Sequence, residues 1–181
     1  MMKLSLLKKI PAALGLAVLL SSCASSYEPG RYVKETPKLT LSTYFNGRLQ
    51  AWGMFQDRSG HVVKRFTVIM QCAWKDGVGT LHEDFTYADG SKQTRIWTLK
   101  ETAPGRYTGS AADVIGTAEG IVSGNTLHWN YVLALDVDGT TYHVDFDDIM
   151  VLMDDKTMLN RAIMRKYGVE LGSVTLSFSK P

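Results

Sequence analysis

Short runs of strand-forming residues, each followed by a tight-turn signal, recur from about residue 38 to the end of the chain. Thr, Val, Tyr, Phe and Trp dominate these runs, and such residues fit a pleated, half-buried surface. Helix-period patterns are weak over the same region. The expected strands are 38–45, 47–57, 61–75, 78–88, 91–101, 105–111, 113–122, 125–136, 140–153, 157–166 and 172–179.

The reversals between these runs are the stronger evidence for the fold. Three dipeptides predict type I′ hairpins, because both central positions of that turn take positive φ, which Asn, Asp and Gly tolerate. They are Asn46-Gly47, Asp89-Gly90 and Asp138-Gly139, and slightly longer loops are expected at 58–60 and 123–125. A chain that reverses after nearly every strand forms an antiparallel meander, and closure into a barrel protects its two edges.

We therefore predict an all-β fold for residues 37–181, a single up-and-down antiparallel β-barrel resembling the lipocalin group, with about 8–10 strands. A barrel of this size is filled by side chains or holds one small ligand. The glycines at 105, 109, 116, 120 and 124 are interpreted as strand kinks that curve the barrel.

The first 22 residues predict a lipoprotein signal peptide with a helical apolar region. Three lysines precede the apolar stretch 10–20, which is shorter than the roughly 20 residues that a membrane-spanning helix needs. The segment Leu20-Ser21-Ser22-Cys23 resembles the bacterial lipobox, so we expect lipid on Cys23. The alternative is an ordinary secretory signal that happens to contain a cysteine. Residues 23–36 are then a lipidated tether.

Ala24, where an aspartate would favour retention in the inner membrane, predicts the periplasmic face of the outer membrane, by resemblance to sorted Gram-negative lipoproteins. Two or more acyl chains, at about 0.8 kcal/mol per buried methylene, anchor a protein stably. The membrane, contacted through the lipid on Cys23, is therefore an expected partner.

Charge and motifs exclude several classes of function. Without its signal, the chain has 17 basic and 18 acidic side chains and no basic patch with interleaved aromatics, so we expect no nucleic-acid partner. The four histidines show no metal-ligand spacing, no catalytic motif is present, and we expect neither a metal nor a cofactor. Cys72, unable to pair with a lipidated Cys23, is expected to be buried.

The segment around Asp138-Gly139 allows a prediction of strand register. With a two-residue loop, Trp129 faces Asp148 and Tyr131 faces Phe146. This face is large, apolar and aromatic, so it points inward and carries Asp148 with it. A buried carboxylate needs a partner, or its pKa rises.

Arg95 and Arg161 are the candidate partners of Asp148. With Asp89-Gly90 as a two-residue loop, Asp84 faces Arg95 and His82 faces Trp97. The sequence does not decide which face of that hairpin lies inside. The candidate ligand-binding residues are Trp129, Tyr131, Phe146, Asp148, Arg95 and Arg161. They form either the polar end of a ligand cavity or a structural ion pair that fixes register, and the second interpretation carries more weight.

Several segments are similar to those of a known family. They include Ala51-Trp-Gly53, Phe55-Gln-Asp-Arg-Ser-Gly60, Glu83-Asp-Phe-Thr-Tyr-Ala-Asp-Gly90, Tyr107-Thr-Gly109 and Phe146-Asp-Asp-Ile-Met150. These resemble a family of uncharacterised Gram-negative bacterial lipoproteins, catalogued as a domain of unknown function. The resemblance implies a periplasm-facing lipoprotein with a lipocalin-like barrel and no established activity. Its members are often encoded near enzymes that modify membrane lipids, which favours a lipid-related role.

Three functions stay open at this point. The chain is a carrier of a small apolar ligand such as a lipid, a lipocalin-like enzyme acting on a lipid, or an outer-membrane scaffold with a packed barrel that binds proteins. A carrier needs an open cavity, a scaffold has a filled barrel, and an enzyme needs an acid of raised pKa that opens into the cavity. The absence of a catalytic motif favours the functions that are not enzymatic.

Overall fold

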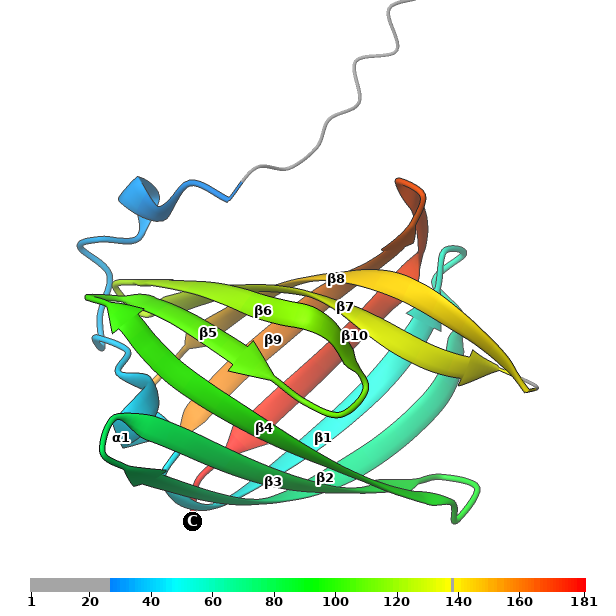
Figure 1. Ribbon diagram of the computed structural model, residues 1–181, viewed down its shortest axis with the longest axis horizontal. Coiled ribbons are helices and arrows are strands. Elements are labelled where there is room, and N and C mark those ends of the chain that lie inside the picture. Colours follow the sequence, from blue (N-terminus) through cyan, green and yellow to red (C-terminus); the bar gives the residue numbers. More distant parts are fainter. Residues whose placement is uncertain (1–26, 138) are drawn as a thin grey trace, which may run out of the picture.

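The computed structural model of the protein describes residues 27–137 and 139–181. The expected signal peptide, Cys23 and Ala24 lie outside the described residues. Ten antiparallel strands close into one up-and-down barrel (Figure 1), in which each strand pairs with its neighbours in sequence and β1 pairs with β10. The predicted all-β barrel is confirmed.

The strands are long enough to make a deep barrel. Their bounds are β1 Gly47–Asp57, β2 Val62–Lys75, β3 Val78–Tyr87, β4 Lys92–Ala103, β5 Arg106–Ser110, β6 Val114–Ser123, β7 Thr126–Val137, β8 Thr140–Leu152, β9 Thr157–Lys166 and β10 Val169–Ser179. A 3-10 turn, η1 (Pro29–Arg31), and a short helix, α1 (Leu41–Tyr44), precede them. The predicted strands agree closely, except that β10 begins earlier than expected and the run 38–45 is not a strand.

The helix α1 plugs one end of the barrel, which explains why residues 38–45 do not form a strand. Leu41, Tyr44 and Phe45 are buried there, and the Trp74 indole N–H donates to the carbonyl of Phe45 at 2.7 Å. Burial of these apolar groups across the barrel end outweighs strand propensity. The predicted hairpin at Asn46-Gly47 is therefore wrong, because this dipeptide connects α1 to β1.

The β3–β4 hairpin has a longer loop than predicted, which shifts its register by one residue. The Asp89 carboxylate accepts hydrogen bonds from the backbone N–H and the hydroxyl of Ser91, at 2.9 and 2.6 Å, and so widens the turn. Arg95 therefore lies opposite Glu83 and not Asp84, while His82 lies opposite Ile96 and not Trp97. The structure also answers which face of this hairpin lies inside, since Glu83 and Arg95 both line the interior of the barrel.

The β7–β8 register is confirmed. Trp129 lies opposite Asp148, and Tyr131 lies opposite Phe146. Gly109 and Gly120, on the neighbouring strands β5 and β6, lie so close to Trp129 that a Cβ at either position would overlap the indole. At these two positions the glycine makes room for a core tryptophan.

The segment before the barrel runs along its outer wall. The Ser123 hydroxyl donates to the carbonyl of Pro29 at 2.6 Å, and the ring of Tyr27 stacks on His128 at 4.5 Å. All ten strands, the α1 plug and both clusters of buried apolar residues lie within residues 39–181. This part of the chain thus contains a complete hydrogen-bonded barrel with its own core. None of the helices among the described residues is long and apolar enough to cross a membrane.

Candidate ligand-binding cavity

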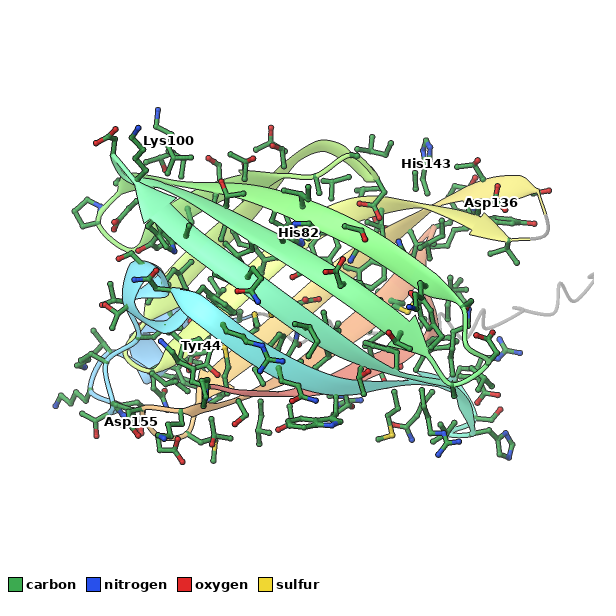
Figure 2. The ribbon with its side chains drawn as sticks, turned by 90° about the horizontal axis from the view of Figure 1, so that it is seen from below. Tyr44, His82, Lys100, Asp136, His143 and Asp155 are labelled. Carbon is green, nitrogen blue, oxygen red and sulfur yellow. The ribbon has the colours of Figure 1, made fainter. Side chains whose placement is uncertain are left out.

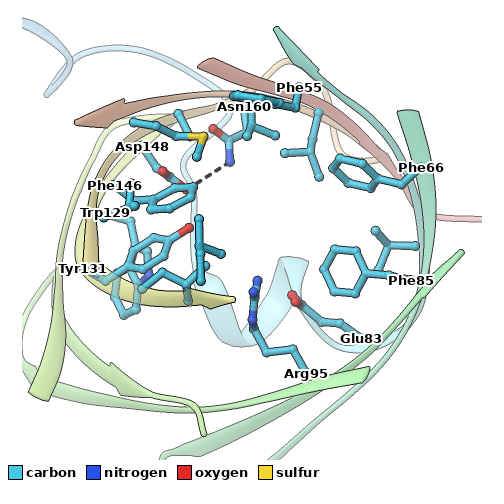
Figure 3. Close-up of a pocket in the computed structure, with 18 of the residues that line it drawn as sticks. Phe55, Phe66, Glu83, Phe85, Arg95, Trp129, Tyr131, Phe146, Asp148 and Asn160 are labelled. Atoms are coloured by element: carbon cyan, nitrogen blue, oxygen red, sulfur yellow. Dashed lines mark hydrogen bonds between the residues drawn. The ribbon is translucent and has the colours of Figure 1, made fainter. Parts of the chain in front are cut away.

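The barrel encloses a cavity of about 710 Å³ (Figure 3). Leu41 and Phe45 of the α1 plug line one end of it. At the other end, the lining residues Val63, Val137 and Leu171 are also exposed to solvent, so the cavity opens among the β1–β2, β7–β8 and β9–β10 hairpins. Its volume lies within the range of about 300–1,000 Å³ that is usual for small-molecule sites.

Aromatic side chains form most of the wall at the middle of the cavity. Tyr131 stacks on Phe146 at 4.9 Å and meets Trp97 edge-on at 5.3 Å. On the opposite wall, Phe66 and Phe85 pack at 5.7 Å. Rings of this kind offer large apolar contact area to a bound molecule.

Asp148 and Asn160 form a polar pair in this apolar wall. The two side chains are each 6% exposed, and Nδ2 of Asn160 donates to Oδ2 of Asp148 at 3.3 Å. Burial raises the pKa of Asp148 from 3.8 to about 7, although the bond from Asn160 opposes the rise. Among the described residues, Oδ1 of each side chain has no hydrogen-bond partner.

Glu83 and Arg95 form a second polar group on the opposite wall (Figure 3). Arg95 makes a bidentate ion pair with Asp113, in which Nε donates to Oδ1 at 3.1 Å and Nη2 donates to Oδ2 at 2.8 Å. Glu83 keeps partial exposure because it faces the lumen. Burial raises its pKa to about 7, against the lowering effect of Arg95. The cavity therefore contains two carboxyl groups that titrate near neutral pH.

Five of the six residues predicted to bind ligand line the cavity. They are Arg95, Trp129, Tyr131, Phe146 and Asp148. The sixth prediction is wrong in its placement, since Arg161 alternates outward on β9 and is exposed. Its neighbours Asn160 and Ala162 take the inward positions. The ion pair expected between Arg95 and Asp84 or Asp148 is also wrong, because Arg95 bonds Asp113.

Three polar residues of the site were missed from the sequence. Glu83 lies on the inner face of β3, and the sequence does not decide which face of the β3–β4 hairpin points inward. Asn160 could have been found from the alternation of Met158, Asn160 and Ala162 on one face of β9. Asp113 begins the expected strand 113–122 but lies in the β5–β6 connection, where strand alternation does not determine the direction of a side chain.

The mouth of the cavity carries exposed apolar side chains. These are Val63, Val137, Tyr142 and Leu171. Two lysines stand among them, with the Lys64 ammonium 4.8 Å from the ring of Tyr87 and the Lys166 ammonium 4.5 Å from the ring of Tyr142. An apolar rim continuous with an apolar cavity gives a hydrophobic molecule a path into the barrel.

Among the described residues, neither a reactive cysteine nor a histidine metal site is found. Cys72 is buried, as predicted, and burial raises its pKa to about 12, which suppresses the reactive thiolate. His82 and His143 lie exposed on the outer face of different strands (Figure 2). Within residues 27–137 and 139–181, no group of three or more His, Cys, Asp or Glu side chains is arranged to hold a metal ion.

The fold and the site define a class: a closed ten-stranded β-barrel with an internal, largely apolar cavity that opens at one end. The chain belongs to the DUF3833 family, described as "Protein of unknown function (DUF3833)", whose model matches residues 17–180. The predicted membership of a family of unknown function is thereby confirmed. No curated protein matches the chain.

Two solved structures match the chain at low sequence identity. One is a de novo designed fluorescence-activating β-barrel, with 9% sequence identity, a TM-score of 0.42, and coverage of 79% of this chain and 99% of the design. The other is a protein of unknown function from the DUF3598 family of Nostoc punctiforme, with 12% identity and a TM-score of 0.49. That match covers 81% of this chain and 50% of the other, so the chain spans about half of that protein's length.

Proposed function

We propose that this protein binds a small apolar ligand, such as a lipid, inside its barrel. The observation that carries the proposal is the cavity of about 710 Å³, which is lined by aromatic and aliphatic side chains and reaches solvent through an apolar rim. A scaffold with a packed barrel has no need of such a cavity. A few polar groups placed in a mainly apolar pocket are the usual means by which a protein orients a ligand.

The location forms part of the same proposal. The lipobox-like segment that ends at Cys23 supports a lipid anchor, and Ala24 supports the periplasmic face of the outer membrane. The predicted membrane partner and the predicted apolar ligand fit together, because an anchored barrel stays next to a source of lipid. Cys23→Ser tests the anchor: we expect the full chain to incorporate labelled fatty acid in a Gram-negative host and the variant to incorporate none. If the full chain takes up no label, or the variant takes up as much, the lipid anchor is wrong.

Native mass spectrometry tests ligand binding directly. A chain that starts at Ala24 retains the whole barrel and lacks the expected lipid anchor. We expect a co-purified adduct whose mass, after denaturation and extraction, matches a lipid or another apolar metabolite. A clean apo mass, combined with no change in tryptophan fluorescence on addition of dodecyl-chain ligands, would contradict the proposal.

A second function is favoured by one observation. Asp148 and Glu83 both line the cavity and have a pKa of about 7, which suits a general acid or base at neutral pH. An enzyme that moves a proton on a bound lipid would use such a group. Incubation of the purified protein with a total lipid extract separates the two functions, since an enzyme changes the mass or isomer pattern of a lipid and Asp148→Asn or Glu83→Gln abolishes that change. A carrier returns every lipid unaltered.

A further inference from the structure

Two acceptor oxygens in the cavity wall lack a donor among the described residues. They are Oδ1 of Asp148 and Oδ1 of Asn160. Both side chains are more than nine-tenths buried, and both reach into the cavity from the neighbouring strands β8 and β9 (Figure 3). A buried acceptor without a donor carries a desolvation cost. A bound group that donates hydrogen bonds removes this cost, whereas a group that only accepts does not.

The cationic side chain of Arg95, in the same part of the cavity, does not reverse this preference for hydrogen-bond donors. Arg95 directs Nε and Nη2 to the carboxylate of Asp113 in a bidentate pair. Its cross-strand neighbour Glu83 is a further acid that faces the cavity. A ligand carboxylate would therefore compete with Asp113 for the guanidinium and would meet two acidic side chains, Glu83 and Asp148. Unlike Arg95, Lys64 and Lys166 lie at the mouth.

We propose that the cavity selects amphiphiles whose head group donates hydrogen bonds, a hydroxyl or an ammonium group, and discriminates against free carboxylates. The inference rests on the proposed function and names the ligand class for the same cavity. The head group binds Asp148 and Asn160, and the apolar body lies along Phe146 and Tyr131 toward the mouth. Asp148 is only four residues from Leu152, where β8 ends at the plugged side of the barrel, so the head group enters first.

A set of four ligands, each with twelve carbons in its main chain, tests the head-group preference. Dodecylamine and dodecanol donate hydrogen bonds, the methyl ester of dodecanoic acid is neutral and only accepts, and dodecanoate is an anionic acceptor. Binding to the chain from Ala24 is measured below the micellar concentration by calorimetry and by the fluorescence of Trp97 and Trp129, which line the cavity. The assay runs at about pH 8, above the pKa of Asp148.

We expect the amine and the alcohol to bind at least ~10-fold more tightly than the ester, and dodecanoate to bind most weakly, because a hydrogen bond to a charged acceptor is one of the stronger polar contacts. The amine-to-alcohol ratio shows which donor head the site prefers. If dodecanoate or the ester binds as tightly as both donors, the inference is wrong while the proposed function survives. If none of the four ligands binds, the proposed function itself fails.

Asp148→Asn and Asp145→Asn form a matched pair of variants. Both remove one carboxylate from β8, but Asp145 is exposed on the outer face. We expect Asp148→Asn to lose most of the preference for amine over ester and Asp145→Asn to keep it. An unchanged preference in folded Asp148→Asn contradicts the placement of the head group. If that variant does not fold, the ranking of the four ligands on the unaltered protein still decides the question.

Discussion

Nδ2 of Asn160 donates a hydrogen bond to Oδ2 of Asp148 at 3.3 Å, while Oδ1 of Asp148 and Oδ1 of Asn160 have no donor among the described residues. The pair therefore satisfies half of its polar atoms inside the protein. Because the pair lies in an otherwise apolar wall, its two unpaired oxygens mark the place where a polar group of a ligand can bind. Burial of a carboxyl group in this way also has consequences for stability.

Stability should fall as the pH rises between about pH 5 and about pH 7, because the pKa of Asp148 is raised from 3.8 to about 7. The unfolded chain releases its proton first, so the native state binds more protons throughout this window, and the unfolding free energy decreases with pH. Glu83, raised from 4.5 to about 7, acts in the same direction. We expect the melting temperature to fall by about 5 °C or more across the window.

The variants Asp148→Asn and Asp145→Asn identify the group responsible for this pH dependence. The first variant has no carboxyl at the buried position, so its melting temperature should vary less between the two pH values. The exposed control should follow the unaltered protein. Equal slopes for all three proteins would mean that Asp148 titrates near its ordinary value in the folded state.

Arg95→Ala should destabilise the barrel by about 2 kcal/mol, because it leaves the half-buried Asp113 carboxylate without its bidentate partner. The same substitution removes the cation that lowers the pKa of Glu83, so that pKa should rise further. Urea unfolding of Arg95→Ala, Asp113→Ala and the double variant gives the coupling energy. Strictly additive effects would show that the pair contributes nothing to stability.

Gly120→Ala should cost about 1–3 kcal/mol, because a methyl group at this position overlaps the ring of Trp129 and forces a core side chain to move. Gly30→Ala is the control, since no heavy atom lies within 4 Å of the added Cβ. Thermal melts of the two variants measure the difference. Equal stability would indicate that Trp129 has another place in the core.

Cys72 should react slowly with thiol reagents in the folded protein, because burial raises its pKa to about 12. In the chain from Ala24 it is the only cysteine, so the reaction with a chromogenic disulfide reports this site alone. We expect complete labelling of the thiol in denaturant. Without denaturant, the labelling rate should be less than about a tenth of the rate in denaturant. Rapid labelling of the native protein would place the thiol at the surface.

The sequence predicts the barrel well because its strands and turns are local signals. Trp129 and Asp148 could be paired from one dipeptide, since the spacing of a two-residue hairpin fixes every partner along the two strands. The same reasoning failed for Arg95, where the Asp89 carboxylate widens the turn and moves the register by one residue. It also failed for residues 38–45, whose β-rich composition does not reveal that Leu41 and Phe45 close the barrel.

Residues of the site could be predicted only where they lie in a strand whose inner face is known from the alternation of its side chains. Asp148 was found because its aromatic neighbours identify the inner face of β8. The prediction for Arg161 is wrong because it does not rest on a hairpin register for β9. Asp113 lies in a loop and not in a strand, so strand alternation cannot predict its contact with Arg95. The contact forms because the closed barrel brings the β5–β6 connection close to β4.

Ligand retention in a barrel with a filled lumen tests the central claim most directly. Ala162 is buried and lines the cavity, whereas Ile163 is the next residue on β9 and faces outward. Ala162→Phe and Ile163→Phe are purified in parallel from the chain that starts at Ala24 and compared by native mass spectrometry. If the cavity holds the ligand, Ala162→Phe loses the co-purified adduct and Ile163→Phe keeps it. A folded Ala162→Phe protein that carries the adduct at the same occupancy as Ile163→Phe would contradict ligand binding inside the barrel.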